Sequence, residues 1–452
     1  MNRYPFIALS CLLALSSWSL WTRYRQGRLL TPASGLHLQI LIFFGIGGFA
    51  FLMFQDVEPK LSSADVTRFT AICCWPLVIG YSVAVILENY WFRLKTQEEL
   101  VLLRGYKLPT DILFILTFLG DAGYFLDGRL KMHGLEAIPA YLKELFFPCL
   151  LLSIIYGLSK TDSRRSFAVF QFLIALTIAI ISPWRSVMVY VGAAIWMAIL
   201  LTRPRWIAWV SILGLFALLY VIPMQNLKKA NYEQFQMNPW SLVQEGLGLS
   251  MSERTQDLER FVAIRVNYVR ESVYVEHSLE SGQALLHGET YKNIIYQLVP
   301  RMFWHEKPEM AYWAGFELPR SIGLLGKDDL YTSWAVNMFA EAAYNFGQSG
   351  IIWFVPVVFM LALGMERLFP KIYKFPQTIV VANITFFYFF LAQTTMIFIV
   401  SIAVAILFIL KLVDWAMLYF ESATGPAVNA NRKNANSRRR GRMPSPAISN
   451  PE

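Results

Sequence analysis

The feature that most constrains this chain is a series of apolar segments, each about as long as a membrane-spanning helix. The hydrocarbon core of a bilayer is about 30 Å thick and needs roughly 20 apolar residues per helix. Charged residues make up only 16% of the chain, against about 25% in an average soluble protein. We therefore expect an all-α polytopic membrane protein with about 11 transmembrane helices. The predicted spans are residues 5–21, 36–54, 69–92, 109–126, 142–158, 166–182, 186–201, 206–223, 350–365, 377–394 and 396–420.

The distribution of basic residues predicts how these helices are oriented. Lys and Arg cluster in alternate short loops and in the C-terminal tail, which is the pattern of the positive-inside rule. The long stretch 225–348 instead carries 11 Lys and Arg against 15 Asp and Glu. We expect this stretch and the N-terminus outside the cytoplasm and the C-terminus inside. The net charge of +9 then reflects topology, and no nucleic acid is expected as a partner.

Composition divides the chain into four regions. The tail is rich in Asn, Arg, Ser and Pro, and it is predicted to be disordered. The first span is predicted to be retained, with a cleaved signal peptide as the alternative. In chain order the regions are helices 1 to 8 in 1–224, a large, partly helical extracytoplasmic loop in 225–349, helices 9 to 11 in 350–420, and a basic cytoplasmic tail in 421–452. Within the loop, apolar spacing predicts helices over 255–286, 291–299 and 334–346.

Several common site motifs are absent from the sequence. It contains no dinucleotide-binding glycine fingerprint, no Walker loop and no His-Glu-x-x-His zinc motif. It also lacks an Asp-x-Asp pair of the kind that holds the metal of a sugar nucleotide, because Asp328 and Asp329 are adjacent. The four cysteines all lie in apolar segments, which is typical of small buried residues. We expect neither a metal ion nor another cofactor.

Basic side chains of the outer regions are the main candidates for binding. Arg185 follows a short outer turn where the positive-inside rule disfavours a cation, so it either binds an anionic ligand or extends to lipid headgroups. The planar guanidinium group forms two parallel hydrogen bonds to phosphate, so arginines suit a diphosphate. For each arginine taken singly, the alternative to binding a ligand is a solvated or ion-paired role at the surface. The candidates in the loop are Arg265, Arg270, Arg301, Lys307 and Arg320.

Four further side chains complete the candidate set. His305 is either a general base near neutral pH or an exposed loop histidine. Glu341 lies in an apolar helical stretch, where a carboxylate needs a partner such as an arginine. Trp304, like the other tryptophans of the loop, suits either a sugar-binding face or a layer on the membrane surface. Tyr291 begins the amphipathic stretch 291–299.

Several blocks of the loop together resemble a known family. They are Gly288-Glu289-Thr290-Tyr291, residues 299–304 (Val-Pro-Arg-Met-Phe-Trp) with Lys307-Pro308, and residues 341–350 (Glu-Ala-Ala-Tyr-Asn-Phe-Gly-Gln-Ser-Gly). With Arg265 in a predicted helix, Thr332, and Arg185 between adjacent spans, they resemble the Wzy-type O-antigen polymerases, which join oligosaccharide repeat units of bacterial surface polysaccharides. The resemblance covers about residues 180–360.

The resemblance implies a bacterial inner-membrane glycosyltransferase with a GT-C-like architecture, working at the outer face. A glycan on undecaprenyl diphosphate would be transferred to the terminal sugar of a second lipid-linked repeat unit, without a metal. Its partners would be these lipid-linked donor and acceptor molecules, the bilayer and a chain-length regulator protein. In that reaction we expect Arg265, Arg301, Glu341 and His305 to be catalytic. His305 is a candidate through its own chemistry, since many relatives carry a proline or another residue at its position. The expected substrate-binding residues are Arg185, Arg270, Lys307, Arg320, Trp304 and Tyr291.

Three alternatives remain open from the sequence, and one of them is a non-enzymatic partner in polysaccharide assembly. An O-antigen ligase would use the same type of donor but transfer the glycan to the lipid A core. A flippase or other transporter of lipid-linked oligosaccharides belongs to a different class. It would need charged residues lining the spans, and the sequence places few charges there, mainly Glu88 and Asp121.

Overall fold

The computed structural model describes most of the chain up to residue 372 and a few residues beyond it. The described residues are mostly helical and include no strand, so the prediction of an all-α protein is confirmed. They are 3–54, 61–91, 110–126, 139, 142–159, 163–181, 185–230, 239–292, 304, 306, 317–326, 336–372, 385, 386, 389, 390 and 411.

Five of the described helices are long and apolar enough to cross a membrane, which supports a membrane protein. They are Tyr4–Arg25, Pro32–Met53, Ser63–Tyr90, Pro204–Met224 and Met338–Leu368. Four shorter apolar helices coincide with further predicted spans, namely Leu113–Leu126, Phe146–Leu158, Arg165–Ile178 and Val191–Thr202. The predicted spans 377–394 and 396–420 fall almost wholly outside the described residues. The total of about 11 therefore stays a prediction.

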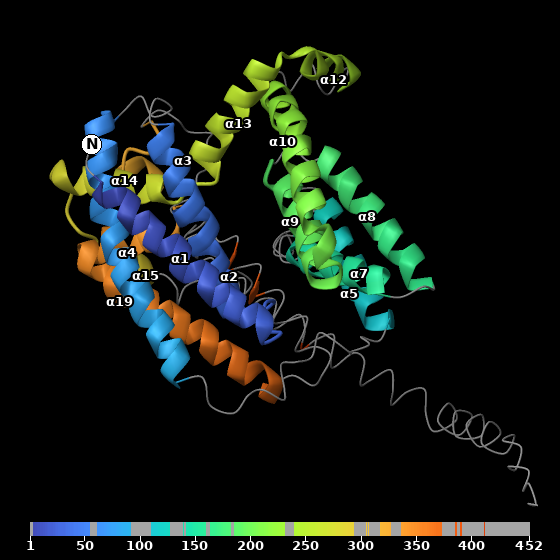
Figure 1. The fold of residues 1–452 in the computed structure, drawn as a ribbon, viewed down its shortest axis with the longest axis horizontal. Coiled ribbons are helices and arrows are strands. Elements are labelled where there is room, and N and C mark those ends of the chain that lie inside the picture. The colour runs from blue at the N-terminus through green and yellow to red at the C-terminus, as the bar shows by residue number, and fades with distance from the viewer. Residues whose placement is uncertain are drawn as a thin grey trace, which may run out of the picture. The chain divides into compact units, whose positions relative to one another are not determined.

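One group of membrane helices brings residues 4–91 together with residues 338–372, far along the chain (Figure 1). It consists of α1 (Tyr4–Arg25), the continuous helix 32–53, α4 (Ser63–Trp91) and α19 (Met338–Ile372). Helix 32–53 comprises α2 (Pro32–Gln39), a π-helical segment η1 (Ile40–Ile46) and α3 (Gly47–Met53). Buried aromatic side chains fill the group, among them Phe51, Phe69, Tyr81 and Phe359.

A second group of apolar helices follows along the chain. Its members pack on one another through a core that includes Phe146, Leu150, Ala194 and Met197. They are α5 (Thr110–Leu126), the short η4 (Lys143–Leu145), α7 (Phe146–Ser159), α8 (Ser163–Ile181), α9 (Arg185–Thr202), the short η5 (Pro204–Trp206) and α10 (Ile207–Ala230). Trp209 and Ile212 of α10 are exposed, which is expected of a helix that faces lipid.

The loop region contributes α12 (Pro239–Gly248), α13 (Met251–Arg265), α14 (Val269–Glu280), α15 (Glu289–Lys292) and α18 (Leu318–Ser321). Residues 255–286 are predicted to be helical, and the chain forms two helices there, α13 and α14, with a break at residues 266–268. Asn267 explains the break, since its Oδ1 accepts from the backbone N–H groups of Val269 and Arg270 at 2.9 and 3.3 Å. Arg265 and Arg270 therefore lie on separate helices.

Polar contacts occur at both ends of α4. Near its start, Arg68 pairs with Glu280 of α14 at 2.5 Å, and the ring of Phe69 contacts that of His277 at 5.8 Å. Glu88 pairs with Arg23 at 2.6 Å near the other end. At 1.5 Å per residue, the 20 residues from 68 to 88 cover about 30 Å, the thickness of a hydrocarbon core. These two polar layers have the spacing expected for the two faces of a bilayer.

Candidate functional site

The break between α13 and α14 is attached directly to a membrane helix. Tyr268 N donates to the carbonyl of Phe43 at 3.1 Å, and the two aromatic rings stack with centroids 4.3 Å apart. Phe43 lies in the π-helical segment η1. Gly47 permits the close approach, because a Cβ there would collide with the backbone of residues 266 and 267. The start of α14 is thus held against the α2–α3 helix.

Two buried side chains fix the starts of α14 and α19 relative to each other. Asn337 Oδ1 accepts from the N–H groups of Phe339 and Ala340 at 3.0 and 2.9 Å, which caps α19. Its Nδ2 donates to Tyr268 O at 3.0 Å and to Glu271 Oε2 at 2.6 Å. Asn337 N also donates to Glu271 Oε2, at 2.5 Å. Because Glu271 and Asn337 are fully buried, this junction forms a rigid base for the site.

Asn345 joins two of the sequence blocks that carry the family resemblance. Its Oδ1 accepts from Gly288 N at 3.0 Å, and its Nδ2 donates to Thr290 Oγ1 and to Glu341 O, both at 2.8 Å. Backbone N–H groups of Leu286 and His287 donate to the carbonyls of Tyr344 and Asn345 at 3.1 and 3.0 Å. Residues 286–290 therefore lie along the first turns of α19. We call this unit, residues 286–291 with 341–347, the paired block.

A kink in α19 makes this pairing possible. Gly347 has φ +69° and ψ −165°, a conformation that interrupts the helix and that glycine adopts most readily. An interruption of the i to i+4 ladder at this position leaves the carbonyls of Tyr344 and Asn345 to accept from residues 286 and 287. The predicted helix 334–346 and the predicted span from 350 are in fact two parts of one kinked helix.

Tyr291 and Glu341 are brought together in the paired block. Tyr291 is largely buried, and its ring stacks on Phe346 and Phe354 with centroid distances of 5.9 and 5.7 Å. Burial, and secondly the charge of Glu341, raise the pKa of Tyr291, so its hydroxyl stays protonated. That hydroxyl has no hydrogen-bond partner among the described residues. Glu341 is fully buried. A phenol hydroxyl can donate to a polar substrate group, and a carboxylate can accept from one.

The described basic candidates do not form one cluster. The Arg270 guanidinium carbon lies 5.4 Å from the centroid of the Tyr274 ring, in the first turns of α14. Arg320 pairs with Glu317 at 3.5 Å in α18, which meets the last turn of α14 where Ser278 Oγ lies 3.5 Å from Ser321 O. The eight residues from 270 to 278 cover about 12 Å of helix. Arg270 and Arg320 thus lie near opposite ends of α14.

The other candidates are described in part or not at all. Trp304 is half-buried. Arg185 is the first residue of α9 and Arg265 the last of α13, and the structure describes only their backbones. Arg301, His305 and Lys307 lie outside the described residues. Their proposed roles stay predictions.

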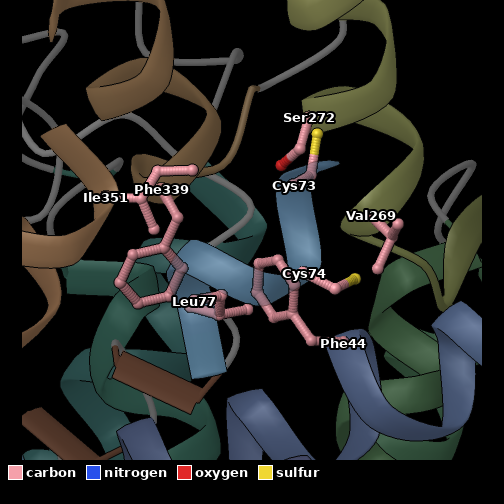
Figure 2. A pocket seen from close by; sticks show the side chains of 8 residues that line it. All are labelled: Phe44, Cys73, Cys74, Leu77, Val269, Ser272, Phe339 and Ile351. Carbon is pink, nitrogen blue, oxygen red and sulfur yellow. The ribbon is translucent and has the colours of Figure 1, made fainter. Parts of the chain in front are cut away.

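The apolar void beneath α14 is too small to hold a substrate (Figure 2). Its volume of about 10 Å³ is close to the minimum for one water molecule. Phe44, Cys74, Leu77 and Phe339 contribute to its lining. The interior contact between α14 and the membrane helices is therefore packing.

A buried ionic network is the site that the sequence did not predict. Arg23 pairs with Glu88 at 2.6 Å and with Glu366 at 3.0 Å, and Arg28 pairs with Glu366 at 2.5 Å. His37 completes it, with Nε2 2.8 Å from Glu88 Oε2. The sequence placed Arg23 and Arg28 in a basic loop, whereas α1 continues to Arg25 and Arg23 is only 1% exposed. The sequence did contain a signal for this network, because Glu88 and Glu366 are carboxylates near the ends of two apolar helices.

Comparisons with known proteins add no family. No protein-family model matches the chain, and no curated protein or solved structure is matched. Among the described residues no three His, Cys, Asp or Glu side chains are grouped so that they could hold a metal ion. Metal-independent chemistry stays a prediction, because candidate residues of the loop lie outside that set.

Proposed function

We propose that this protein polymerises oligosaccharide repeat units linked to undecaprenyl diphosphate, as a metal-independent glycosyltransferase at the outer face of the bacterial inner membrane. The observation that carries the proposal is the paired block. Two of the short sequence blocks that resemble the Wzy-type polymerases form one hydrogen-bonded unit through Asn345.

The position of the paired block along α19 agrees with a site at one face of the bilayer. The kink residue Gly347 lies in this block, and Glu366 of the ionic network lies near the other end of the same helix. The helix between these two residues covers about 28 Å. The paired block and the ionic network are therefore separated by about the thickness of a hydrocarbon core.

The chemistry of the paired block supports this reaction class. The acceptor sugar presents hydroxyl groups, to which a protonated phenol and a carboxylate, here those of Tyr291 and Glu341, are chemically complementary. Both groups are buried, so contact with the sugar requires the paired block to open. We assign these two side chains to orienting the acceptor sugar. The leaving group is a diphosphate, and without a metal its charge must be stabilised by cations. We assign that role to Arg265, Arg301 and Arg185, with Arg270, Lys307 and Arg320 contacting the glycan or its phosphates.

The remaining sequence candidates take roles in the same reaction. His305 accepts the proton of the attacking hydroxyl, and Trp304 provides a face for a sugar ring. The acceptor oxygen attacks the anomeric carbon, the bond from that carbon to the diphosphate oxygen breaks, and undecaprenyl diphosphate leaves. An O-antigen ligase would follow the same steps with a lipid A core as acceptor, so the acceptor decides between the two.

Two matched pairs of variants test the proposal in cells. Arg265→Ala should leave lipid-linked glycan at one repeat unit, whereas Arg260→Ala, an exposed arginine of the same helix, should give normal chain lengths. Tyr291→Phe removes only the hydroxyl and keeps the ring stacking, and it should lower the polymerisation rate by up to about tenfold, the value of one hydrogen bond. Its partner is Tyr90→Phe, which removes an exposed hydroxyl at the far end of α4 and should leave the rate unchanged. Normal chain lengths in a well-expressed Arg265→Ala variant would contradict the assignment.

One observation favours the alternative that the protein is a flippase. The membrane helices carry a buried network of Arg23, Arg28, Glu88 and Glu366, and buried charges in such helices often mark transport pathways. Substrate sites of transporters lie near the middle of the bilayer, however, whereas this network lies near the ends of α1 and α4. Lipid-linked repeat units that cross a vesicle membrane without growing in length would favour the flippase.

A further inference from the structure

A polar cavity of about 290 Å³ opens beside the ionic network, at the end of α1 and α4 that the positive-inside pattern predicts to be cytoplasmic. This volume is near the lower limit of small-molecule sites, about 300 to 1,000 Å³. It therefore suits a ligand much smaller than an oligosaccharide. Its lining residues are Trp18, Ser19, Thr22, Arg23, Gln26, Arg28, Glu88 and Asn89.

The cavity wall offers a cationic part and an anionic part. The Arg28 side chain lines the cavity and is 17% exposed, while its Nη2 is bound to Glu366. Glu88 contributes a carboxylate whose side chain is 14% exposed. A guanidinium group carries five N–H donors, so Arg28 can donate to an acceptor oxygen in the cavity.

The charges of the network are already balanced. Arg23 and Arg28 are matched by Glu88 and Glu366. A ligand with a net charge would disturb that balance in a partly buried place. A zwitterion preserves it, with its negative group at Arg28 and its positive group at Glu88.

The position of the cavity indicates that the ligand comes from the membrane. Trp18 forms part of the lining and is 52% exposed, and Trp21, one turn further on, is 59% exposed. Both belong to α1, which is apolar enough to span a bilayer. Tryptophan is enriched at the level of the lipid headgroups.

We propose that this cavity binds the headgroup of a zwitterionic phospholipid that carries a phosphate and a primary ammonium group. A phosphate oxygen accepts from the Arg28 guanidinium group. The ammonium group lies between the Glu88 carboxylate and the Trp18 indole, which attracts cations through its ring face. The bound lipid would fasten α1 to α4 from the bilayer side, and this site is independent of the proposed polymerase reaction.

Lipid titration of the purified full chain tests the proposal. The chain in detergent is titrated with phosphatidylethanolamine, with the anionic phosphatidylglycerol, and with free phosphoethanolamine, and native mass spectrometry counts the bound molecules. We expect one saturable phosphatidylethanolamine site. Arg28→Gln should weaken it about tenfold or more, because a charge-assisted hydrogen bond is lost. Arg25→Gln removes an exposed charge that does not line the cavity, and it should leave the affinity unchanged.

A second matched pair guards against misfolding, because Arg28 also supports the ionic network. Trp18→Leu should weaken phosphatidylethanolamine binding about threefold, whereas Trp21→Leu, exposed but outside the lining, should not. Equal losses in Arg28→Gln and Arg25→Gln, or in both tryptophan variants, would overturn the site. Equal affinity for phosphatidylglycerol would overturn the zwitterionic assignment. Competition by free phosphoethanolamine at the affinity of the lipid would overturn the membrane source.

Discussion

Removing the charge of Glu366 should destabilise the fold more than the loss of any exposed ion pair does. Its side chain is 1% exposed and accepts from Arg23 Nη1 at 3.0 Å, from Arg28 Nη2 at 2.5 Å and from Ala33 N at 3.0 Å. Glu366→Gln leaves the buried guanidinium group of Arg23 and the partly buried one of Arg28 against the single carboxylate of Glu88. Breaking a buried pair by removal of one partner costs about 3 to 5 kcal/mol. We expect a loss of that size in the free energy of unfolding.

The measurement is equilibrium unfolding of the purified chain in detergent micelles, followed by circular dichroism. Glu280→Gln is the matched control, because Glu280 pairs with Arg68 at the same 2.5 Å but with side chains 38% and 58% exposed. An exposed pair contributes less than about 1 kcal/mol. The double variant Glu366→Gln with Arg28→Gln restores equal numbers of charges, so it should lose about 1 to 3 kcal/mol less than the sum of the single losses. A Glu366→Gln loss no larger than that of Glu280→Gln would refute the reasoning.

Three further predictions concern Asn345 and Gly347 of the paired block and Glu276 of α14. Asn345→Ala removes the acceptor of Gly288 N and the donor to Thr290 Oγ1, so amide hydrogen exchange at residues 286 and 287 should accelerate at least about tenfold, whereas the exposed Ser349→Ala should change nothing. Gly347→Ala places a side chain at φ +69° and should cost about 1 to 3 kcal/mol, measured by thermal unfolding; an unchanged melting temperature would show that the kink is unstrained. Burial raises the pKa of Glu276 above its usual 4.5, although a hydrogen bond from Gln348 acts in the opposite direction. Protonated Glu276 therefore stabilises the fold fully below about pH 4.5, and this stabilisation is lost as the pH rises through the raised pKa. Glu276→Gln should therefore raise the melting temperature at pH 7 and give no gain near pH 4, and an equal gain at both values would contradict that origin.

The membrane helices could be predicted from the sequence because their signal is local. An apolar run of sufficient length predicts a span from its own residues, and α1, α4 and α10 lie where such runs occur. The break at Asn267 could not be predicted in this way. The apolar spacing of residues 255–286 continues through it, and the hydrogen bonds of the Asn267 side chain to the start of α14 decide the conformation.

The contacts of the two polar sites could not be predicted because their partners are distant in the sequence. Arg23 and Glu366 are separated by 343 positions, and Asn345 and Gly288 by 57. Charge position alone made Arg23 a topology signal, whereas its partners make it part of a buried network. The sequence did select both side chains of the paired block. Tyr291 belongs to the short block 288–291, and Glu341 is a carboxylate in an apolar helical stretch, where it is unusual. The side chains of Arg185, Arg265 and Arg301 remain predicted participants.

Polymerisation by the purified protein tests the central claim most directly. The chain is reconstituted in liposomes with lipid-linked repeat units taken from cells of its source organism that lack the gene, and the glycan released from the lipid is sized by mass spectrometry. The proposed function predicts a ladder of glycans at whole multiples of the repeat unit, formed in the presence of a metal chelator and absent with Arg265→Ala. Glycans that stay at one repeat unit, with protein shown by circular dichroism to be folded in the liposomes, would contradict it.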